Sequence, residues 1–222
     1  TLNKIVAVTK KAEPELPLLH DPGTKWTYSP GTRVLGWVVE KVSGESLDVY
    51  LRTRIFEPLG MVDTGHAVPA DKVARVVTVH ARKSGKLVET RNQAKEASPV
   101  RGDGGLYSTA RDYGRFLHML LNDGSLDGVK ILSPQTVHSM GQPHIGANFI
   151  RTQPDAMPER TRPFPIGAGL DKFGLGFQIT AVDPKYAKFR SPGSLSWGGI
   201  NNTHFWIDPK HRIGGIVLMQ VL

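Results

Sequence analysis

Apolar residues repeat at helical spacing in the first half of the chain and mark two adjacent helices. The first helix is predicted over Val34–Val42, and Ser43-Gly44 ends it through a left-handed cap. The apolar positions that share one face of this helix are Val34, Leu35, Val38, Val39 and Val42. A second helix follows Ser46, which suits an N-cap, and Pro58-Leu59-Gly60 ends it. The pattern therefore predicts a helical hairpin.

A third helix has the clearest pattern in the chain. Thr109 and Asp112 have the spacing of a capping box, and Gly124 closes the element. Its apolar stripe consists of Tyr113, Phe116, Leu117, Leu120 and Leu121. Ser133-Pro134 predicts the start of another short helix, with proline at its first position. Ser84-Gly85 predicts the turn of a small hairpin at the surface.

The last quarter of the chain has the pattern of a sheet. Apolar and β-branched runs bounded by Gly and Pro predict an antiparallel meander made of Gly174–Thr180, Thr203–Ile207 and Ile213–Gln220. We expect three regions: a mainly helical one over 1–140, an irregular loop or lid over 141–172, and C-terminal strands over 173–222. The fold class is therefore α+β, with a helical domain packed against an antiparallel sheet.

Composition narrows the class of protein. With 222 residues, 39% of them hydrophobic, the chain can bury a sizeable core. No apolar run approaches the ~18 residues that a membrane span needs. The net charge is +8, but Lys and Arg are spread singly or in pairs, which disfavours nucleic acid as a partner. The absence of cysteine excludes disulfides and thiolate metal sites here and leaves the compartment undetermined.

Short motifs along the chain resemble those of the β-lactamase-related serine hydrolases, which comprise class C β-lactamases, carboxylesterases and penicillin-binding proteins. The motifs occur in family order, at Pro22–Ser29, Val34–Gly44, Ile55–Met61, Gly102–Asp112, Trp197–Gly199 and Phe205–Pro209. The resemblance covers most of the chain. It implies the β-lactamase/transpeptidase-like fold, with a catalytic cleft between the helical domain and the sheet.

The nucleophile of this family lies in a Ser-x-x-Lys motif upstream of the tyrosine motif. No serine of this chain has lysine three residues later. We therefore expect the chain to be an internal piece of a longer enzyme whose upstream segment carries the serine. By itself the piece should show negligible esterase activity.

Tyr28 is the candidate general base, because the resemblance puts the lysine of Ser-x-x-Lys beside this tyrosine. A tyrosine titrates near pH ~10, so a phenolate near neutral pH needs about 4 kcal/mol of stabilisation from nearby cations. The alternative is a half-buried tyrosine that anchors a loop. Pro30 stands where the family often has asparagine, which favours ester chemistry over β-lactam chemistry.

Trp197, Gly198, Gly199 and Ile200 are the candidate substrate-binding residues. The Trp-Gly-Gly motif matches the place where β-lactamases carry Lys-Thr-Gly and several esterase relatives carry Trp-x-Gly. Glycines let a substrate approach the backbone of an edge strand, and the backbone N–H of Ile200 then forms half of an oxyanion hole. The alternative is a glycine bulge beside a core tryptophan.

Other glycine-rich or polar segments give weaker indications of a site. Gly102–Gly105 lacks the lysine of a phosphate loop and is interpreted as a tight turn beside the cleft. The histidines show no metal-ligand spacing. A triad of Ser196, His204 and Asp208 stays open, although no Gly-x-Ser-x-Gly motif supports it.

The resemblance implies hydrolysis or transfer of an ester acyl group through an acyl-serine, with a small-molecule ester or amide substrate and no cofactor or metal. A carboxylesterase is favoured, and a β-lactamase or a D-amino-acid peptidase is the alternative within the class. An inactive binding or scaffold protein with the same fold is the alternative from another class.

Overall fold

The computed structural model describes residues 18–91, 100–152, 167–182 and 190–222. Within these ranges the α-helices are α2 (Gly31–Ser43), α3 (Leu47–Leu51), α4 (Ala110–Leu121) and α5 (Pro134–Met140). A π-helical turn (Arg52–Phe56) extends α3, and a 3-10 helix spans Ala70–Arg75. The strands are β1 (Val79–Lys83), β2 (Lys86–Arg91), β3 (Ser125–Leu126), β4 (Val129–Lys130), β5 (Lys172–Phe173), β6 (Gln178–Ile179), β7 (Leu195–Gly199), β8 (Thr203–Asp208) and β9 (Ile213–Leu218).

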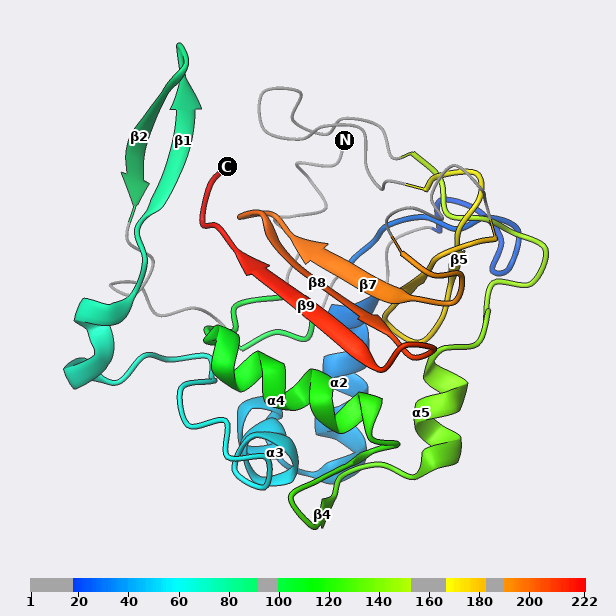
Figure 1. The fold of residues 1–222 in the computed structure, drawn as a ribbon, viewed down its shortest axis with the longest axis horizontal. Helices are drawn as coiled ribbons and strands as arrows, with labels where there is room; N and C mark the ends of the chain where they lie inside the picture. The colour runs from blue at the N-terminus through cyan, green and yellow to red at the C-terminus, as the bar shows by residue number, and fades with distance from the viewer. Residues whose placement is uncertain (1–17, 92–99, 153–166, 183–189) are drawn as a thin grey trace.

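The main sheet is antiparallel and has the strand order β5-β6-β7-β8-β9. Its strands follow the chain, so the predicted meander is confirmed, with β7 and the short β5 added to it. Helices dominate the region before residue 141 and the sheet follows it (Figure 1). The predicted α+β arrangement is therefore confirmed, while the division into three regions stays a prediction. Residues 153–166 of the predicted loop or lid lie outside the described residues.

Helix α4 runs along one face of the main sheet (Figure 1). It begins as its sequence predicts, because the Thr109 side chain accepts a hydrogen bond from the Asp112 backbone N–H at 3.2 Å. Tyr113 packs against Phe205 of β8, with ring centroids 5.2 Å apart. The buried apolar core lies between this helix, the chain after α3 and the sheet, and consists of Phe56, Leu59, Met61, Leu117, Met119, Leu120, Leu126, Phe177, Ile179, Leu195 and Ile207.

Helix α2 ends as predicted, because Gly44 adopts a left-handed φ of 73° and its N–H donates to the Glu40 carbonyl. On its buried side, the helix contacts the rest of the chain through Gly36, which lies against Gly102. A Cβ on Gly36 would lie 3.1 Å from the Gly102 nitrogen, and one on Gly102 would lie 2.2 Å from the Thr32 carbonyl oxygen. This close approach holds the 101–105 turn against the first half of α2.

Two smaller predictions are also confirmed. The β1–β2 hairpin turns at Ser84 and Gly85, both with positive φ, and projects from the body of the molecule (Figure 1). Helix α5 starts at Pro134, and the Ser133 side chain accepts from the Thr136 N–H. None of the helices in the described ranges is long and apolar enough to cross a bilayer.

Candidate active site

Tyr28 lies in the extended segment just before α2. The Ser29 hydroxyl accepts a hydrogen bond from the Gly31 N–H at 3.3 Å, so the residue after the tyrosine helps to start the helix. The Tyr28 ring lies 6.0 Å from the ring of Trp197 in β7, with the two planes inclined at 31°. The two candidate motifs, 169 positions apart in the chain (197 − 28), are therefore neighbours in space.

Two further aromatic residues extend this contact into a cluster. Phe173 of β5 stands edge-on to Trp197 at 5.2 Å, and Trp26 lies 5.4 Å from Phe173. We call Trp26, Tyr28, Phe173 and Trp197 the aromatic cluster. Sequence analysis missed Trp26 and Phe173. The alternation Trp26-x-Tyr28 in an extended segment puts both side chains on one side and was an available signal for Trp26, whereas nothing local marks Phe173.

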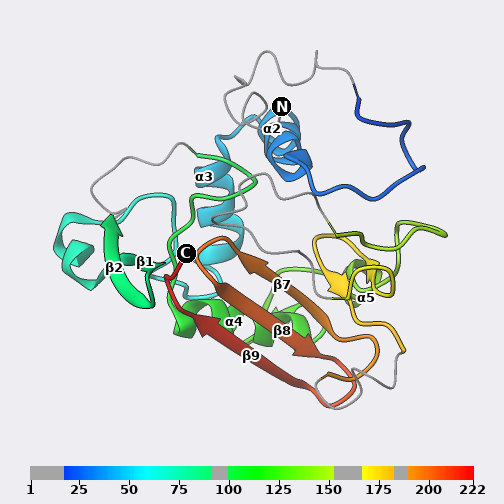
Figure 2. The same ribbon diagram turned by 90° about the horizontal axis from the view of Figure 1, so that it is seen from above.

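A short chain of hydrogen bonds ties the Tyr28 segment to β5. The Asn148 side chain donates to the Gly23 carbonyl at 2.7 Å. Lys172 in turn donates to the carbonyls of Asn148, at 2.7 Å, and Gly146, at 2.9 Å. The segment before α2 and β5 lie on the same side of the molecule in both views (Figure 2). The 146–148 loop thus holds the two sides of the aromatic cluster together.

The electrostatic setting of Tyr28 favours the neutral phenol. Tyr28 is 58% exposed, but its partial burial raises its pKa above the ordinary value, and the negative charge of Asp103 raises it further. Asp103 reaches this place on the turn that packs against α2, where it accepts from the Arg33 guanidinium at 2.7 Å. Both of these causes, burial and the charge of Asp103, favour the neutral phenol of Tyr28 over the phenolate.

The Trp-Gly-Gly motif lies within β7. A Cβ on Gly198 would lie 2.6 Å from the His204 ring, and one on Gly199 would lie 2.5 Å from the Thr203 hydroxyl. A side chain at either position would therefore force the β8 side chain opposite it to move. In the described residues, β6 pairs only with the first two residues of β7, so Trp197–Gly199 pair with β8 on one side alone. Ile200 follows in the turn and is 64% exposed.

The triad of Ser196, His204 and Asp208 is not formed, and that hypothesis is wrong. Ser196 is buried and accepts from Arg190, and His204 stands opposite Gly198 rather than Ser196. Asp208 instead accepts from the His211 ring and from the His211 backbone N–H. Ser196 of β7 and the two β8 residues lie on the same face of the sheet, but they do not hydrogen-bond to one another.

A second serine, histidine and aspartate meet in the loop after β8. The Ser191 hydroxyl and the Asp208 carboxylate both contact Nδ1 of His211, at 3.0 and 2.9 Å. A hydrolytic triad needs the serine and the aspartate on different ring nitrogens. This group therefore shapes the turn and does not activate a nucleophile. In the described part of the chain, no three His, Asp or Glu side chains gather as a metal site.

Comparison with known proteins gives consistent relatives. A sequence model of the family described as Beta-lactamase matches residues 8–222. Lovastatin esterase of Penicillium rubens is 32% identical over 221 residues, covering 93% of this chain and 53% of that protein. Monacolin J acid methylbutanoyltransferase of Aspergillus terreus is 30% identical over 218 residues, covering 92% and 51%. The solved structure of unliganded simvastatin synthase from Aspergillus terreus matches with a TM-score of 0.77 at 29% identity, covering 96% and 56%.

The chain belongs to the Beta-lactamase family, and its fold is the β-lactamase/transpeptidase-like α+β fold. Its relatives in this family include, by name, an esterase and an acyltransferase. The chain spans about half the length of the curated relatives it matches.

Proposed function

We propose that this chain is part of a serine hydrolase or acyltransferase of the Beta-lactamase family, in which Tyr28 is the general base. The observation that carries the proposal is the contact of Tyr28 with Trp197 at the start of the Trp-Gly-Gly motif. It brings the candidate base and the candidate oxyanion donors of β7 to one place. The serine and the lysine of Ser-x-x-Lys come, in this proposal, from an upstream segment of the same protein.

Each group has a defined role in the proposed reaction. Tyr28 takes the proton of the serine hydroxyl while the serine oxygen bonds to the ester carbonyl carbon. Backbone N–H groups at the end of β7, with that of Ile200 as the candidate, donate to the oxyanion that develops. Tyr28 returns the proton to the departing alcohol, and water or a second alcohol then removes the acyl group from the serine.

The raised pKa of Tyr28 supports the need for the upstream lysine. A neutral phenol does not accept a proton, and both causes found here, burial and the charge of Asp103, favour that form. A lysine ammonium beside the hydroxyl acts in the opposite direction. The piece alone is therefore expected to turn over esters negligibly.

The aromatic cluster supports an ester with an apolar acyl or alcohol group as substrate. Trp197 offers no cation for a carboxylate, and Phe173 and Trp26 extend its surface with further apolar rings. The names of two relatives, lovastatin esterase and monacolin J acid methylbutanoyltransferase, agree with ester chemistry. Hydrolysis of a β-lactam or of a D-amino-acid peptide is the alternative within the family.

The test uses the native-length protein. We expect a fluorophosphonate to label one serine of that protein and p-nitrophenyl butyrate to be hydrolysed. Tyr28→Phe should lower kcat by roughly 100-fold or more, because general base catalysis contributes about that much. Tyr113→Phe, which keeps the ring that packs against Phe205, is the matched control and should leave kcat unchanged.

Two results would contradict the proposal. No labelling and no turnover in the native-length protein would favour the inactive binding protein. Robust turnover by purified residues 1–222 alone would point to a nucleophile inside this chain instead.

A further inference from the structure

Helix α2 leaves most of its apolar stripe in solvent. Leu35 is 61% exposed, Val38 is 49% exposed and Val42 is 83% exposed, whereas the buried position of the helix is Gly36. Val38 and Val42 lie one turn apart on the same face. A helix with an apolar face of this length normally buries it against another element. The described part of the chain does not supply that element.

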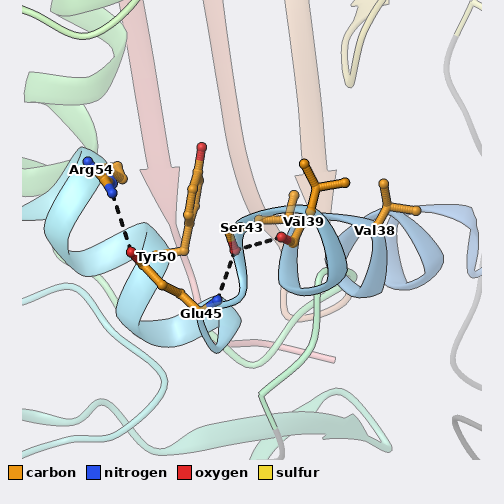
Figure 3. A pocket seen from close by; sticks show the side chains of 7 residues that line it. Val38, Val39, Ser43, Glu45, Tyr50 and Arg54 are labelled. Carbon is orange, nitrogen blue, oxygen red and sulfur yellow. Dashed lines mark hydrogen bonds and ion pairs between the residues drawn. The ribbon is translucent and has the colours of Figure 1, made fainter.

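The exposed stripe continues into a groove between α2 and α3. The groove has a volume of about 520 Å³ and is lined by Val38, Val39, Val42, Ser43, Glu45, Tyr50 and Arg54. Val38 and Val39 from α2 and the ring of Tyr50 from α3 extend to the same side (Figure 3). The groove thus offers an apolar wall along α2 and an aromatic wall on α3.

The far end of the groove is polar, and one carboxylate oxygen of Glu45 there lacks a hydrogen-bond donor among the described residues. Oε1 of Glu45 accepts from Arg54 at 3.3 Å, and Ser43 is engaged with the Val39 carbonyl and the Glu45 N–H (Figure 3). Oε2 of Glu45 is buried and has no hydrogen-bond donor among the described residues. Buried carboxylate oxygens normally have one. The pair of Glu45 and Arg54 thus forms the polar end of the groove.

The length of the relatives indicates what the occupant is. The chain covers 53% of lovastatin esterase and 56% of the matched simvastatin synthase chain, so about half of such a protein has no counterpart here. A ligand of small size would not cover a stripe that runs from Val34 to Val42. A second helix packed along α2 would, since helices pack through such ridges at 8–10 Å between axes.

We propose that the α2–α3 groove is the docking surface for the upstream segment of the same protein, which packs an apolar helical face along Val38 and Val42. This inference rests on the proposed function only in taking the native protein to be longer than this chain. Helix α2 starts at Gly31, three residues after Tyr28. A segment seated along α2 is therefore anchored close to the candidate base.

Cysteine accessibility tests the docking directly, because residues 1–222 contain no cysteine. Val38→Cys, Val42→Cys and the control Val62→Cys are made in the 222-residue chain and in the native-length protein. Val62 is 75% exposed, follows Met61 in the chain, and is not among the residues that line the groove. The rate of maleimide modification is read at the introduced residue by peptide mapping.

We expect all three cysteines to react readily in the 222-residue chain. In the native-length protein, Val38→Cys and Val42→Cys should react at least tenfold more slowly, with Val62→Cys unchanged. Hydrogen exchange of the α2 amides in the unsubstituted proteins is the second measurement. It should show stronger protection in the native-length protein, whether or not a cysteine variant folds.

Three results would overturn the inference. One is equal reactivity and equal exchange of α2 in the two proteins. Another is protection of Val42→Cys in the 222-residue chain that grows with its concentration, which would make a second copy the occupant. The third is a native mass of 24.3 kDa, because no upstream segment then exists.

Fluorophosphonate labelling of the same samples keeps the two proposals separate. A protected α2 without a labelled serine would support the docking surface and contradict the enzyme. A labelled serine with a fully reactive Val42→Cys would support the enzyme and contradict the docking surface.

Discussion

Burial and the charge of Asp103 both favour the neutral form of the Tyr28 phenol. Asp103 raises the pKa of Tyr28 and is itself held by Arg33. Replacing it, as in Asp103→Asn, removes the anion and its ion pair with Arg33, and the loss of the negative charge favours the phenolate. We expect the pKa of Tyr28 in the 222-residue chain to fall.

The ultraviolet absorbance of tyrosinate, titrated against pH, measures that change. Tyr28→Phe in each background identifies the contribution of Tyr28, since the chain has five tyrosines. An unchanged or higher pKa in Asp103→Asn would show that the carboxylate does not act on the phenol.

Asp208 carries a second electrostatic prediction, on stability. Burial raises the pKa of this carboxyl, but hydrogen bonds from His211 and Ser191 outweigh it and lower the pKa to about 2. Because the folded pKa lies below the unfolded one, the stabilisation is present above pH ~4 and is lost as the pH falls toward 2. Asp208→Asn should therefore lower the free energy of unfolding at neutral pH by about 2 kcal/mol.

Urea unfolding at several pH values measures this difference. It should narrow as the pH is lowered below about 4, because the wild-type carboxyl then becomes neutral as well. The control is Asp71→Asn, at an exposed position, which should leave stability nearly unchanged. A difference that stays constant down to low pH would contradict the assigned cause.

At the level of the strands, the side chains of β8 leave little room for a Cβ at Gly198 and Gly199 of β7. Gly198→Ala puts a Cβ within 2.6 Å of the His204 ring and should cost about 1–3 kcal/mol of stability. His204→Ala removes the obstacle, so the double variant should recover much of the loss. Chemical denaturation of the four proteins of the cycle measures both effects.

A glycine of α4 provides the matched control for this cycle. A Cβ on Gly114 meets only Ile216, at an ordinary 3.7 Å, so Gly114→Ala should raise stability by about 0.5–1 kcal/mol. If the double variant is as unstable as Gly198→Ala alone, the cross-strand contact is not the reason for glycine at this position.

The sequence predicted the helices and turns well where the residues that start or end an element lie within one short stretch. The capping residues Thr109 and Asp112, the turn at Ser84-Gly85 and the left-handed Gly44 all act within a few residues, and each was found. The partners of the site were not predictable in this way. Phe173 joins the aromatic cluster through a loop that binds Gly23, and no local pattern encodes so distant a contact.

The Tyr28 and Trp-Gly-Gly motifs were found through family resemblance, and the structure brings them together. The reason for the two glycines was only partly foreseen. Sequence reasoning attributed them to substrate approach, whereas a Cβ at either position would also displace a side chain of β8, His204 or Thr203. The exposure of α2 was also not predictable, because periodicity marks an apolar face but does not say what covers it.

Two apolar surfaces of the molecule remain open to solvent in the described chain. One is the α2 stripe, and the other is the face of the sheet opposite α4, where Ile213 and Val217 are about half exposed. Alternation along β9 puts these two residues on the side away from Ile216, which contacts α4. Figure 2 shows α2 and β9 on separate parts of the molecule.

Exposed apolar surface of this kind binds anilinonaphthalene sulfonate, so the 222-residue chain should enhance its fluorescence. Val42→Gln and Val217→Gln should each lower the signal, and the double variant should lower it further because the two surfaces are separate. Val62→Gln, at an exposed valine outside both surfaces, is the control. The uncharged glutamine keeps the anionic dye from being attracted or repelled. A signal that none of the variants changes would mean that the dye binds elsewhere and that neither surface behaves as an open apolar face.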